Sequence, residues 1–312
     1  MKLNQLKALL AIADAGSIHE AARMLHLTPS ALSKAVKELE REFGTELLTR
    51  SAKGMRLTEC GLMLINRSRL IEAEIGRMHE DVARYRGALG GKLTIGHTGT
   101  AATLPLAETV SDFLQQHPAV ELTVLELRGA QIIRGLDDGT LDLGIISQYG
   151  APKTSLQWHR MLSYDTMLVS NRRRVEKDTL ATLRNEPWLM LDPIDDGESA
   201  VATLFAQFDL PPPKRIVRCS SVALFIQLAA RVDAIMHCMD AVRPTFERYL
   251  SAGTMHRVSL PHALPKLHVY LQYRDESLLT APTADFVARY THHCQRWSDK
   301  TAASLVRMEM AA

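Results

Sequence analysis

Apolar residues recur at helical spacing in three successive segments at the start of the chain. The first covers residues 2–15, and Gly16 ends it. The second is short and follows Ser17. The third begins after Thr28, a hydroxyl residue suited to capping a helix, and has Pro29 at its first position, where a missing N–H is harmless. This pattern predicts three short, closely spaced helices.

The third segment, residues 30–41, has two opposed faces. Its apolar stripe consists of Leu32, Ala35, Val36, Leu39 and Phe43. Its other face consists of Ser30, Ser33, Lys34, Lys37 and Arg41. Hydroxyl and basic side chains suit a groove walled by phosphates, although the same pattern alone also describes a solvated amphipathic helix. The preceding short helix and tight turn make this a helix-turn-helix pattern.

A short basic hairpin is predicted after Gly44. Residues 46–49 favour a strand, and the turn signal at residues 53–54 returns the chain to Leu57. Its basic residues are Arg50, Lys53 and Arg56. Alone, this segment is most simply a surface turn, but beside a basic helix it can lie along a sugar-phosphate backbone as a wing.

One long helix without proline is predicted from Thr58 to Arg86. Its apolar positions alternate in steps of four and three, the repeat of a coiled-coil seam. The seam consists of Leu57, Gly61, Leu64, Ser68, Ile71, Ile75, Met78, Val82 and Tyr85. A helix of about 40 Å is too long to bury this seam against a small head. We expect a second copy of the chain to cover it, chiefly at Leu64, Ile71, Ile75, Met78 and Val82; the alternative is packing on the chain's own body.

Glycines at residues 87–91 predict a hinge, after which short strands alternate with helices. The expected strands are 92–96, 120–127, 141–146, 167–170, 188–191, 215–219, 234–239 and 266–272. The expected helices are 100–117, 130–137, 199–208, 222–231 and 283–298. Such alternation favours βαβ units and mostly parallel sheets.

Composition fits this multidomain interpretation. The chain has 312 residues, 46% of them hydrophobic and 23% charged, which predicts a globular protein of two or three domains. The net charge of +2 indicates no partner by itself. However, the first 58 residues carry nine cations against six anions, so the basic character is concentrated in a small head.

The spacing of the cysteines and the length of the apolar runs indicate the cellular compartment of the protein. The four cysteines have no CxxC spacing and are expected to be reduced thiols. The apolar run at residues 8–13 is too short for a signal peptide, and no stretch approaches the roughly 20 residues of a membrane span. We expect a cytoplasmic protein that does not bind a membrane.

The N-terminal residues resemble the signature of LysR-type transcriptional regulators. The matching residues are Ala21-Ala22, Leu25, Leu27 to Ser33, Leu39-Glu40, Gly44, Leu47 to Arg50 and Leu57 to Gly61. The match runs from Leu3 to Gly61 and continues more loosely over nearly the whole chain. The resemblance implies a winged helix-turn-helix head, a long linker helix, and a two-lobed α/β effector domain like a periplasmic binding protein. It also implies assembly, usually into tetramers.

The resemblance assigns roles to these segments. The head would be residues 1–58, the linker and hinge 59–90, and the effector domain 91–312. Lobe 1 would cover about 91–160 and 267–300, and lobe 2 about 161–266. Double-stranded DNA with a partly palindromic operator would contact Thr28, Pro29, Ser30, Ser33, Lys34 and Lys37 of the recognition helix, and Arg50, Lys53 and Arg56 of the wing. No cofactor or metal is expected.

An effector would lie where strands end and helices begin, because carboxyl ends of strands face a crevice in α/β sheets. These positions are Thr98, Gly99, Thr100, Ser147, Gln148, Ser220 and Ser221. N–H groups and hydroxyls there favour an organic anion, although each hydroxyl is equally explained as a plain helix cap. One departure from the family is the turn from Arg231 to Ala234, which is often glycine-rich in its members.

Other chemistries are weaker alternatives. Cys219 and Cys238 lie where one redox-sensing branch of the family has reactive thiols, but with a different spacing. His292, His293 and Cys294 are adjacent on a helix and diverge around it, so a solvated or half-buried helix face is expected there instead of a metal site. The sequence contains no GxSxG or HExxH motif, and we find no catalytic constellation for an enzyme.

Overall fold

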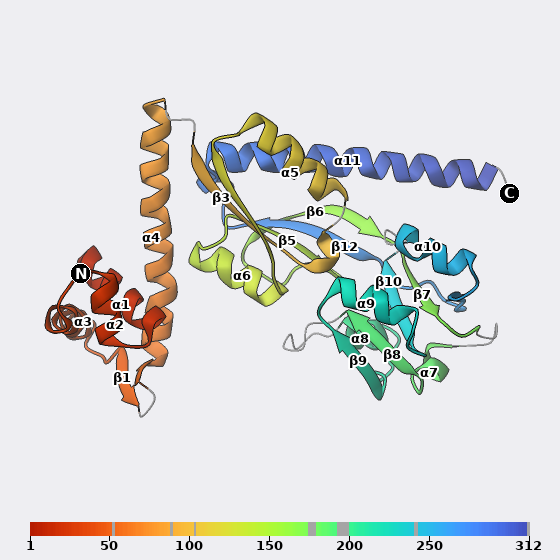
Figure 1. The fold of residues 1–312 in the computed structure, drawn as a ribbon, viewed down its shortest axis with the longest axis horizontal. Helices are drawn as coiled ribbons and strands as arrows, with labels where there is room; N and C mark the ends of the chain where they lie inside the picture. Colours follow the sequence, from red (N-terminus) through yellow and green to blue (C-terminus); the bar gives the residue numbers. More distant parts are fainter. Residues whose placement is uncertain are drawn as a thin grey trace. The chain divides into compact units, whose positions relative to one another are not determined.

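The computed structural model describes residues 1–51, 54–87, 90–102, 104–173, 179–191, 200–239 and 243–310 (Figure 1). The chain divides into two compact units. One contains residues 1–89 with the short segment 134–141, and the other contains residues 90–133 and 142–312. Below, residues 1–89 are called the head and linker helix, and residues 90–310 are called the body.

The head is built from α1 (Leu3–Ala15), α2 (Ile18–Met24) and α3 (Pro29–Phe43). Leu9, Leu32 and Leu39 have no exposed surface and form the centre of its core. Ala21 and Ala22 are also buried, and their small size lets α1 and α3 approach α2 closely. The three predicted helices are confirmed, but Phe43, assigned to the apolar stripe, is 46% exposed.

The predicted hairpin is also present. Strands β1 (Leu48–Ser51) and β2 (Gly54–Leu57) pair antiparallel, with Leu48 opposite Leu57. The Met55 N–H donates to the Gly16 carbonyl oxygen at 3.2 Å, which ties the hairpin to the turn between α1 and α2. Gly54 has φ +112°, and a Cβ there would lie 2.9 Å from the Gly16 oxygen, so this contact requires glycine.

Helix α4 (Glu59–Tyr85) starts in the head and leaves it. The Thr58 hydroxyl accepts a hydrogen bond from the Gly61 N–H at 3.0 Å and donates to the Glu46 carbonyl at 2.8 Å. Gly61 and Ser68 are buried together with Ile65, and Gly61 packs against Leu47 of the head, so these two members of the predicted seam are already covered within the single chain.

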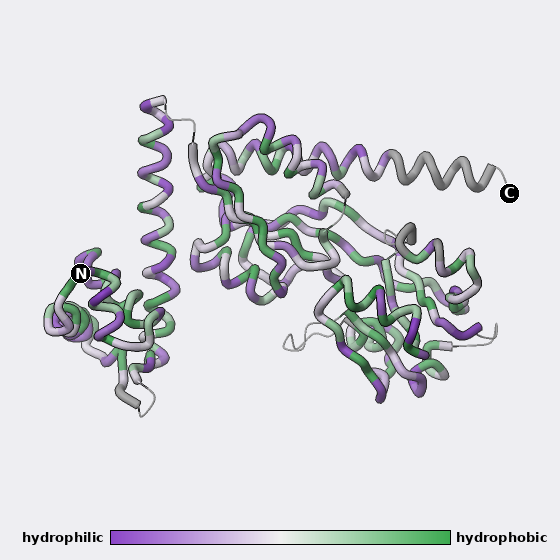
Figure 2. Tube along the Cα trace, in the orientation of Figure 1, coloured by the Kyte–Doolittle hydropathy of each residue, from purple (hydrophilic) through white to green (hydrophobic). Residues whose placement is uncertain are grey.

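Further along α4, apolar side chains are open to solvent in the single chain. The most exposed residues of the seam are Ile71, Met78, Val82 and Tyr85. Hydrophobic and hydrophilic positions alternate along the whole helix (Figure 2). The seam therefore has one part that is buried within the single chain and a second part, farther along α4, that is exposed.

The first sheet of the body has five strands in the order β4-β3-β5-β12-β6. Their bounds are β3 (Gly91–His97), β4 (Val120–Glu126), β5 (Leu143–Gln148), β6 (Gln157–Tyr164) and β12 (Leu267–Tyr273). Strands β4, β3 and β5 are parallel, but β12 runs antiparallel to both β5 and β6. Strands β4, β3, β5 and β6 therefore run in one direction, so the sheet is mostly parallel as expected, and only the late strand β12 enters it in the opposite direction.

Helices surround this first sheet. They are η1 (Gly99–Ala101), α5 (Leu104–Gln116), α6 (Gly129–Asp138) and α11 (Ala281–Met310). The expected single helix 100–117 is therefore two elements. Helices α5 and α11 lie side by side (Figure 1), and Phe113, Phe286 and Tyr290 bury their rings between them and the sheet.

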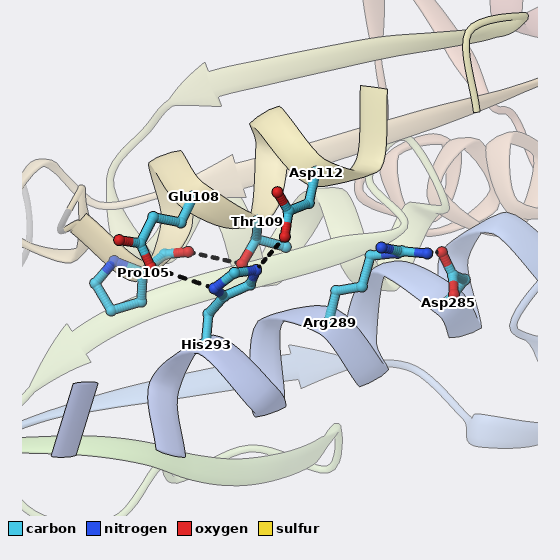
Figure 3. A network of polar contacts seen from close by, with 7 residues as sticks. All are labelled: Pro105, Glu108, Thr109, Asp112, Asp285, Arg289 and His293. Atoms are coloured by element: carbon cyan, nitrogen blue, oxygen red, sulfur yellow. Dashed lines mark hydrogen bonds and ion pairs between the residues drawn. The ribbon is translucent and has the colours of Figure 1, made fainter. Parts of the chain in front are cut away.

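Polar contacts also join α5 to α11 (Figure 3). His293 lies between Glu108 and Asp112, with ring nitrogen to carboxylate distances of 3.2 Å and 2.8 Å. Its ring is buried, so the expected solvated or half-buried face is wrong at His293, whereas His292 is exposed. Within the residues that the structure describes, no three His, Cys, Asp or Glu side chains form a group suited to a metal ion.

The second sheet has the order β11-β7-β10-β8-β9. Its strands are β7 (Thr166–Ser170), β8 (Pro187–Leu191), β9 (Arg215–Cys219), β10 (Ile235–Met239) and β11 (His256–Val258). Strand β8 is parallel to β9 and β10, whereas β7 is antiparallel to β10 and β11. This sheet is also mixed. We call the part of the body around the first sheet lobe 1 and the part around the second sheet lobe 2.

The remaining short elements are α7 (Leu180–Leu183), α8 (Ala200–Ala206), α9 (Val222–Ala229), α10 (Arg243–Ser251) and η3 (Glu276–Leu278). The sequence patterns did not predict β6, β11, α7 or α10. The chain changes lobes between Tyr164 and Thr166, and Met239 of β10 reaches into the core of lobe 1. Among the described helices, none is both long and apolar enough to cross a membrane.

Candidate functional site

The N-terminus of α3 presents hydroxyls to solvent. The Thr28 Oγ1 accepts a hydrogen bond from the Ala31 N–H at 3.2 Å and lies 3.1 Å from the Ser30 Oγ. Thr28, Pro29 and Ser30 are exposed, and Ser33 is half-buried one turn later. The cap therefore fixes the position of two hydroxyls at the free end of the helix.

Basic side chains continue this exposed face along α3. Lys34, Lys37 and Arg41 are all exposed, while Leu32, Val36 and Leu39 on the opposite side are buried in the head core. Because Leu32, Val36 and Leu39 are held in the core, the helix cannot rotate its cations inward. This geometry can hold hydroxyls and positive charges against a surface of phosphates.

Two carboxylates of α3 hold the helix in place, a role that sequence patterns did not identify. One oxygen of Glu40 accepts from the N–H groups of Leu47 and Leu48 at 2.9 Å and 3.2 Å, at the entry to the hairpin. Glu38 accepts from the Gln5 amide of α1 at 3.1 Å. The Glu40 side chain therefore links α3 to the backbone at the start of the hairpin. The spacing of residues in the sequence does not predict this contact.

The hairpin carries the remaining predicted DNA contacts. Arg56 lies on β2 and is exposed. The backbone of Arg50 pairs with Met55 in the hairpin, but its side chain and the whole of Lys53 lie outside the described residues.

In lobe 1, Thr98 and Ser147 come together although 49 residues separate them. The Thr98 Oγ1 accepts from the Ser147 N–H at 3.0 Å, and the Thr98 N–H donates to the Ile145 carbonyl at 3.0 Å. Thr98 makes no side-chain cap to η1, so the plain-cap alternative is wrong for this residue. The Ser147 Oγ is buried and has no hydrogen-bond partner among the described residues.

The two lobes approach each other at Gly99. A Cβ at Gly99 would lie 3.3 Å from a methyl carbon of Val222, the first residue of α9, and 2.8 Å from a carboxylate oxygen of Glu126. Ser221 caps α9 by accepting from the Leu224 N–H at 3.3 Å, and Ser220 beside it is exposed. Gly99 of the predicted set therefore lies beside the start of α9, the helix that Ser221 caps.

The other predicted effector-binding residues of lobe 1 are Gln148 and Thr100. Gln148 is half-buried on β5, opposite His268, and Thr100 lies within η1. The turn that departs from the family is held by polar contacts. Arg231 donates to the Gln227 carbonyl at 2.7 Å, and Asp233 pairs with Arg172 at 2.7 Å.

Sequence patterns missed a pair of side chains at the lobe junction. The Tyr149 hydroxyl lies 3.1 Å from the His237 Nδ1, and their rings are stacked 5.8 Å apart at 11°. Burial lowers the pKa of His237 to about 4 and raises the pKa of Tyr149, with Cys238 adding to the latter shift. No sequence signal joins these two residues, which are 88 positions apart.

The thiols of lobe 2 are not arranged for redox chemistry. Burial raises the pKa of Cys238 to about 12, so this sulfur is a protonated thiol at neutral pH. Cys219 is also buried, and its thiol donates to the Ser221 carbonyl at 3.2 Å. A reactive thiol would instead be exposed and stabilised as the thiolate.

Two family models match the chain in succession. The model for the bacterial regulatory helix-turn-helix protein, lysR family, matches residues 3–62. The model for the LysR substrate binding domain matches residues 86–295.

Known regulators align with most of the chain. The transcriptional regulator TfdS of Cupriavidus pinatubonensis is 28% identical over 289 residues, which are 89% of this chain and 94% of TfdS. The regulator AlsR of Bacillus subtilis is 28% identical over 212 residues, 67% of this chain and 68% of AlsR.

Solved structures have the same fold. The regulator CbnR, crystallised full-length with its target DNA, is 22% identical, covers 95% of this chain with 99% of its own, and has a TM-score of 0.60. LysG from Corynebacterium glutamicum with bound effector Arg is 20% identical, with the same coverage and a TM-score of 0.65. The substrate-domain model alone spans more than half of the sequence, and the chain therefore belongs to the LysR family of bacterial transcriptional regulators.

Proposed function

We propose that this LysR-type regulator binds a partly palindromic operator through the polar face of α3 and the hairpin. Its operator binding or activation would be modulated by an organic anion bound at the lobe junction. The observation that supports the first part best is the division of α3 into a buried apolar side and an exposed side of hydroxyls and cations. A transcriptional regulator with this head acts where DNA is, so we place the protein in the cytoplasm.

Different residues of the head would make different contacts. The proposed set is Thr28, Pro29, Ser30, Ser33, Lys34, Lys37, Arg50, Lys53 and Arg56. Lys34 and Lys37 would supply phosphate affinity, because flexible exposed ammonium groups neutralise backbone charge. Ser30 and Ser33 would approach base edges, because short hydroxyls near the helix start can donate and accept in the major groove.

LysR regulators act as oligomers, and the free part of the α4 seam would supply one self-contact. The proposed residues are Leu64, Ile71, Ile75, Met78 and Val82. Met78 and Val82 are 66% and 58% exposed in the single chain, which a partner helix would cover. Two heads related by a two-fold axis would then match the two halves of the operator, and four chains would pair two such dimers.

The effector would contact Thr98, Gly99, Thr100, Ser147, Gln148, Ser220 and Ser221. The close approach of Gly99 to Val222 supports this set, because it brings the strand ends of lobe 1 to the start of α9. The buried Ser147 Oγ lacks a hydrogen-bond partner among the described residues, and a ligand atom that reached it would supply one. The Glu126 carboxylate beside Gly99 would repel an anion, so the anionic group would lie toward Ser147 and Ser221.

The double substitution Lys34→Ala, Lys37→Ala tests the DNA-binding assignment. Operator affinity should fall sharply, and the dependence of its logarithm on log salt should become shallower by about two, one for each lost phosphate contact. Lys2→Ala with Lys7→Ala is the matched control, because it removes the same charge from two exposed positions, one just before α1 and one within it. Equal effects of the two double substitutions, or unchanged affinity in the first, would refute the assignment.

A further inference from the structure

Tyr149 and His237 form a directional polar contact between the two lobes. Tyr149 comes one residue after β5 of lobe 1, and His237 is the middle residue of β10 in lobe 2. The hydroxyl to Nδ1 distance is 3.1 Å, and the nearly parallel rings lie 5.8 Å apart. Both residues keep some exposed surface, so they lie at the junction and not inside either core.

The chemistry of the pair keeps both side chains uncharged. Burial raises the pKa of Tyr149 and lowers that of His237 to about 4, so both side chains are uncharged at neutral pH. The Tyr149 hydroxyl lies 3.1 Å from Nδ1 and 3.4 Å from Nε2, and the tautomer of His237 decides which of the two residues donates. The neighbouring Cys238 is also a neutral thiol, because burial raises its pKa to about 12.

Each partner is fixed on its own lobe. The Tyr270 hydroxyl of β12 donates to the Gly150 carbonyl at 2.8 Å, which anchors the residue after Tyr149 to the first sheet. His237 pairs along β10 with Leu168 of β7. A movement of one lobe against the other therefore changes the distance between the two side chains.

Two other close approaches of the lobes among the described residues are apolar. Val222 faces Gly99, and Met239 enters the core of lobe 1. Apolar contacts tolerate sliding because the hydrophobic effect has no preferred direction, whereas a hydrogen bond weakens steeply with misalignment. Of these three contacts, the Tyr149–His237 bond is thus the one best suited to define one relative position of the lobes.

We propose that Tyr149 and His237 form an uncharged latch that holds the lobes in one arrangement, and that an effector acts by engaging the polar edge of this pair. The second half rests on the proposed effector site. The latch would take a neutral hydrogen-bonding group of the effector, such as a hydroxyl or an amide, because neither side chain offers a charge. Loss of the bond should shift the balance of lobe arrangements by about three- to tenfold.

Tyr149→Phe tests the latch without any ligand, because it removes the hydroxyl and keeps the ring. Spin labels at Gln115→Cys and Glu247→Cys, both exposed and on different lobes, would report the interlobe distance by pulsed electron paramagnetic resonance. The background needs Cys60→Ser, since the other three cysteines are buried. Labelled chains are diluted into unlabelled ones so that only distances within one chain contribute.

The chain contains a matched control. His159 and Tyr273 form the same kind of pair, with 2.8 Å between Nε2 and the hydroxyl and rings 5.6 Å apart, but both lie in the first sheet. Tyr149→Phe should shift the interlobe distance distribution, and Tyr273→Phe should leave it unchanged. An unchanged distribution in Tyr149→Phe, or an equal shift in both variants, would overturn the latch.

Two further variants identify the partner. His237→Leu should reproduce the shift of Tyr149→Phe, and the double variant should shift no further, because the two side chains share one interaction. His237→Gln keeps an acceptor and should restore much of the wild-type distribution. Additive shifts in the double variant would show that the side chains act separately and would contradict the proposal.

The two proposals can fail separately. Interlobe distances are measured without DNA or effector, so an unshifted Tyr149→Phe leaves the operator and effector assignments untouched. Conversely, unchanged operator affinity in Lys34→Ala, Lys37→Ala leaves the latch untouched. If the latch transmits the effector's signal, Tyr149→Phe should also change operator affinity by about three- to tenfold, whereas Tyr273→Phe should not.

Discussion

Thr28 in the head and Thr98 in the body each directly precede a helix, yet their hydroxyls form hydrogen bonds with different kinds of partner. Thr28 caps its own helix by accepting from Ala31, three residues later. Thr98 leaves its helix uncapped and accepts from Ser147, 49 residues later. Thr28 therefore stabilises the start of its own helix, whereas Thr98 connects two distant segments of lobe 1.

Gly61→Ala should disrupt the head most strongly. The added Cβ would collide with the Leu47 carbonyl, which is backbone and cannot move away cheaply. We expect the free energy of unfolding of the head to fall by about 3 kcal/mol or more, because such overpacking forces the backbone to shift. Hydrogen exchange of residues 3–57 should accelerate, while tryptophan fluorescence should report an unchanged body, since Trp158, Trp188 and Trp297 all lie there.

Gly76→Ala is the control on the same helix. A Cβ at Gly76 meets nothing within 4 Å, and alanine favours helix, so this variant should gain up to about 1 kcal/mol. A loss of head stability in Gly76→Ala equal to that in Gly61→Ala would contradict the Leu47 contact as the cause, because helix propensity favours alanine at both positions.

Acid should weaken the body through His237. Its pKa is about 6.5 when unfolded and about 4 when folded, so above pH 6.5 both states are neutral there and the residue adds no pH dependence. As pH falls from 6.5 to 4, the unfolded chain binds the proton first, and body stability should drop by up to about 3 kcal/mol. Urea unfolding followed by tryptophan fluorescence measures this loss.

His237→Gln should remove that part of the acid sensitivity, because glutamine does not titrate. The comparison is made as the difference in unfolding free energy between pH 6.5 and pH 4.5, so any constant cost of the substitution cancels. Identical differences for wild type and variant would contradict burial as the cause of the lowered pKa.

The smallest expected effects separate the two threonines. Thr28→Ala should cost the head about 1 kcal/mol through its lost cap, and Thr98→Ala should cost the body a similar amount because the Ser147 N–H loses its acceptor. Hydrogen exchange should accelerate around residues 29–32 in the first variant and around residue 147 in the second. The serine variants keep a hydroxyl at both positions and should behave nearly as wild type.

The accuracy of the sequence-based predictions also differs between the head and the body. Thr28, Pro29 and the alternation from Leu32 to Leu39 are local signals, and they predicted the helices of the head correctly. The predictions for the body failed where pairing is non-local. Strand β6 lacked a clear alternation, and the antiparallel entry of β12 beside it depends on pairs such as Leu271 with His159, far apart in the chain.

The candidate sites show the same limit. The exposed face of α3 followed from helical periodicity, because every third or fourth residue shares one side. Glu40, Tyr149 and His237 were missed, because their contacts reach residues that no spacing rule connects to them. The proximity of Thr98 to Ser147 was suggested by the rule that parallel strands end at one edge, but the hydrogen bond between them was not.

The place of β12 between β5 and β6 has a consequence for the order of events during synthesis. The head is complete within the first 85 residues of the chain and contains mainly local contacts, so it can fold while the ribosome is still at work. The first sheet must wait for residues 267–273 before β5 and β6 gain their shared neighbour. For most of translation, a nascent chain would thus carry a finished DNA-binding head ahead of an unfinished sensor with unpaired strand edges. Chaperones would be expected to meet the body and not the head.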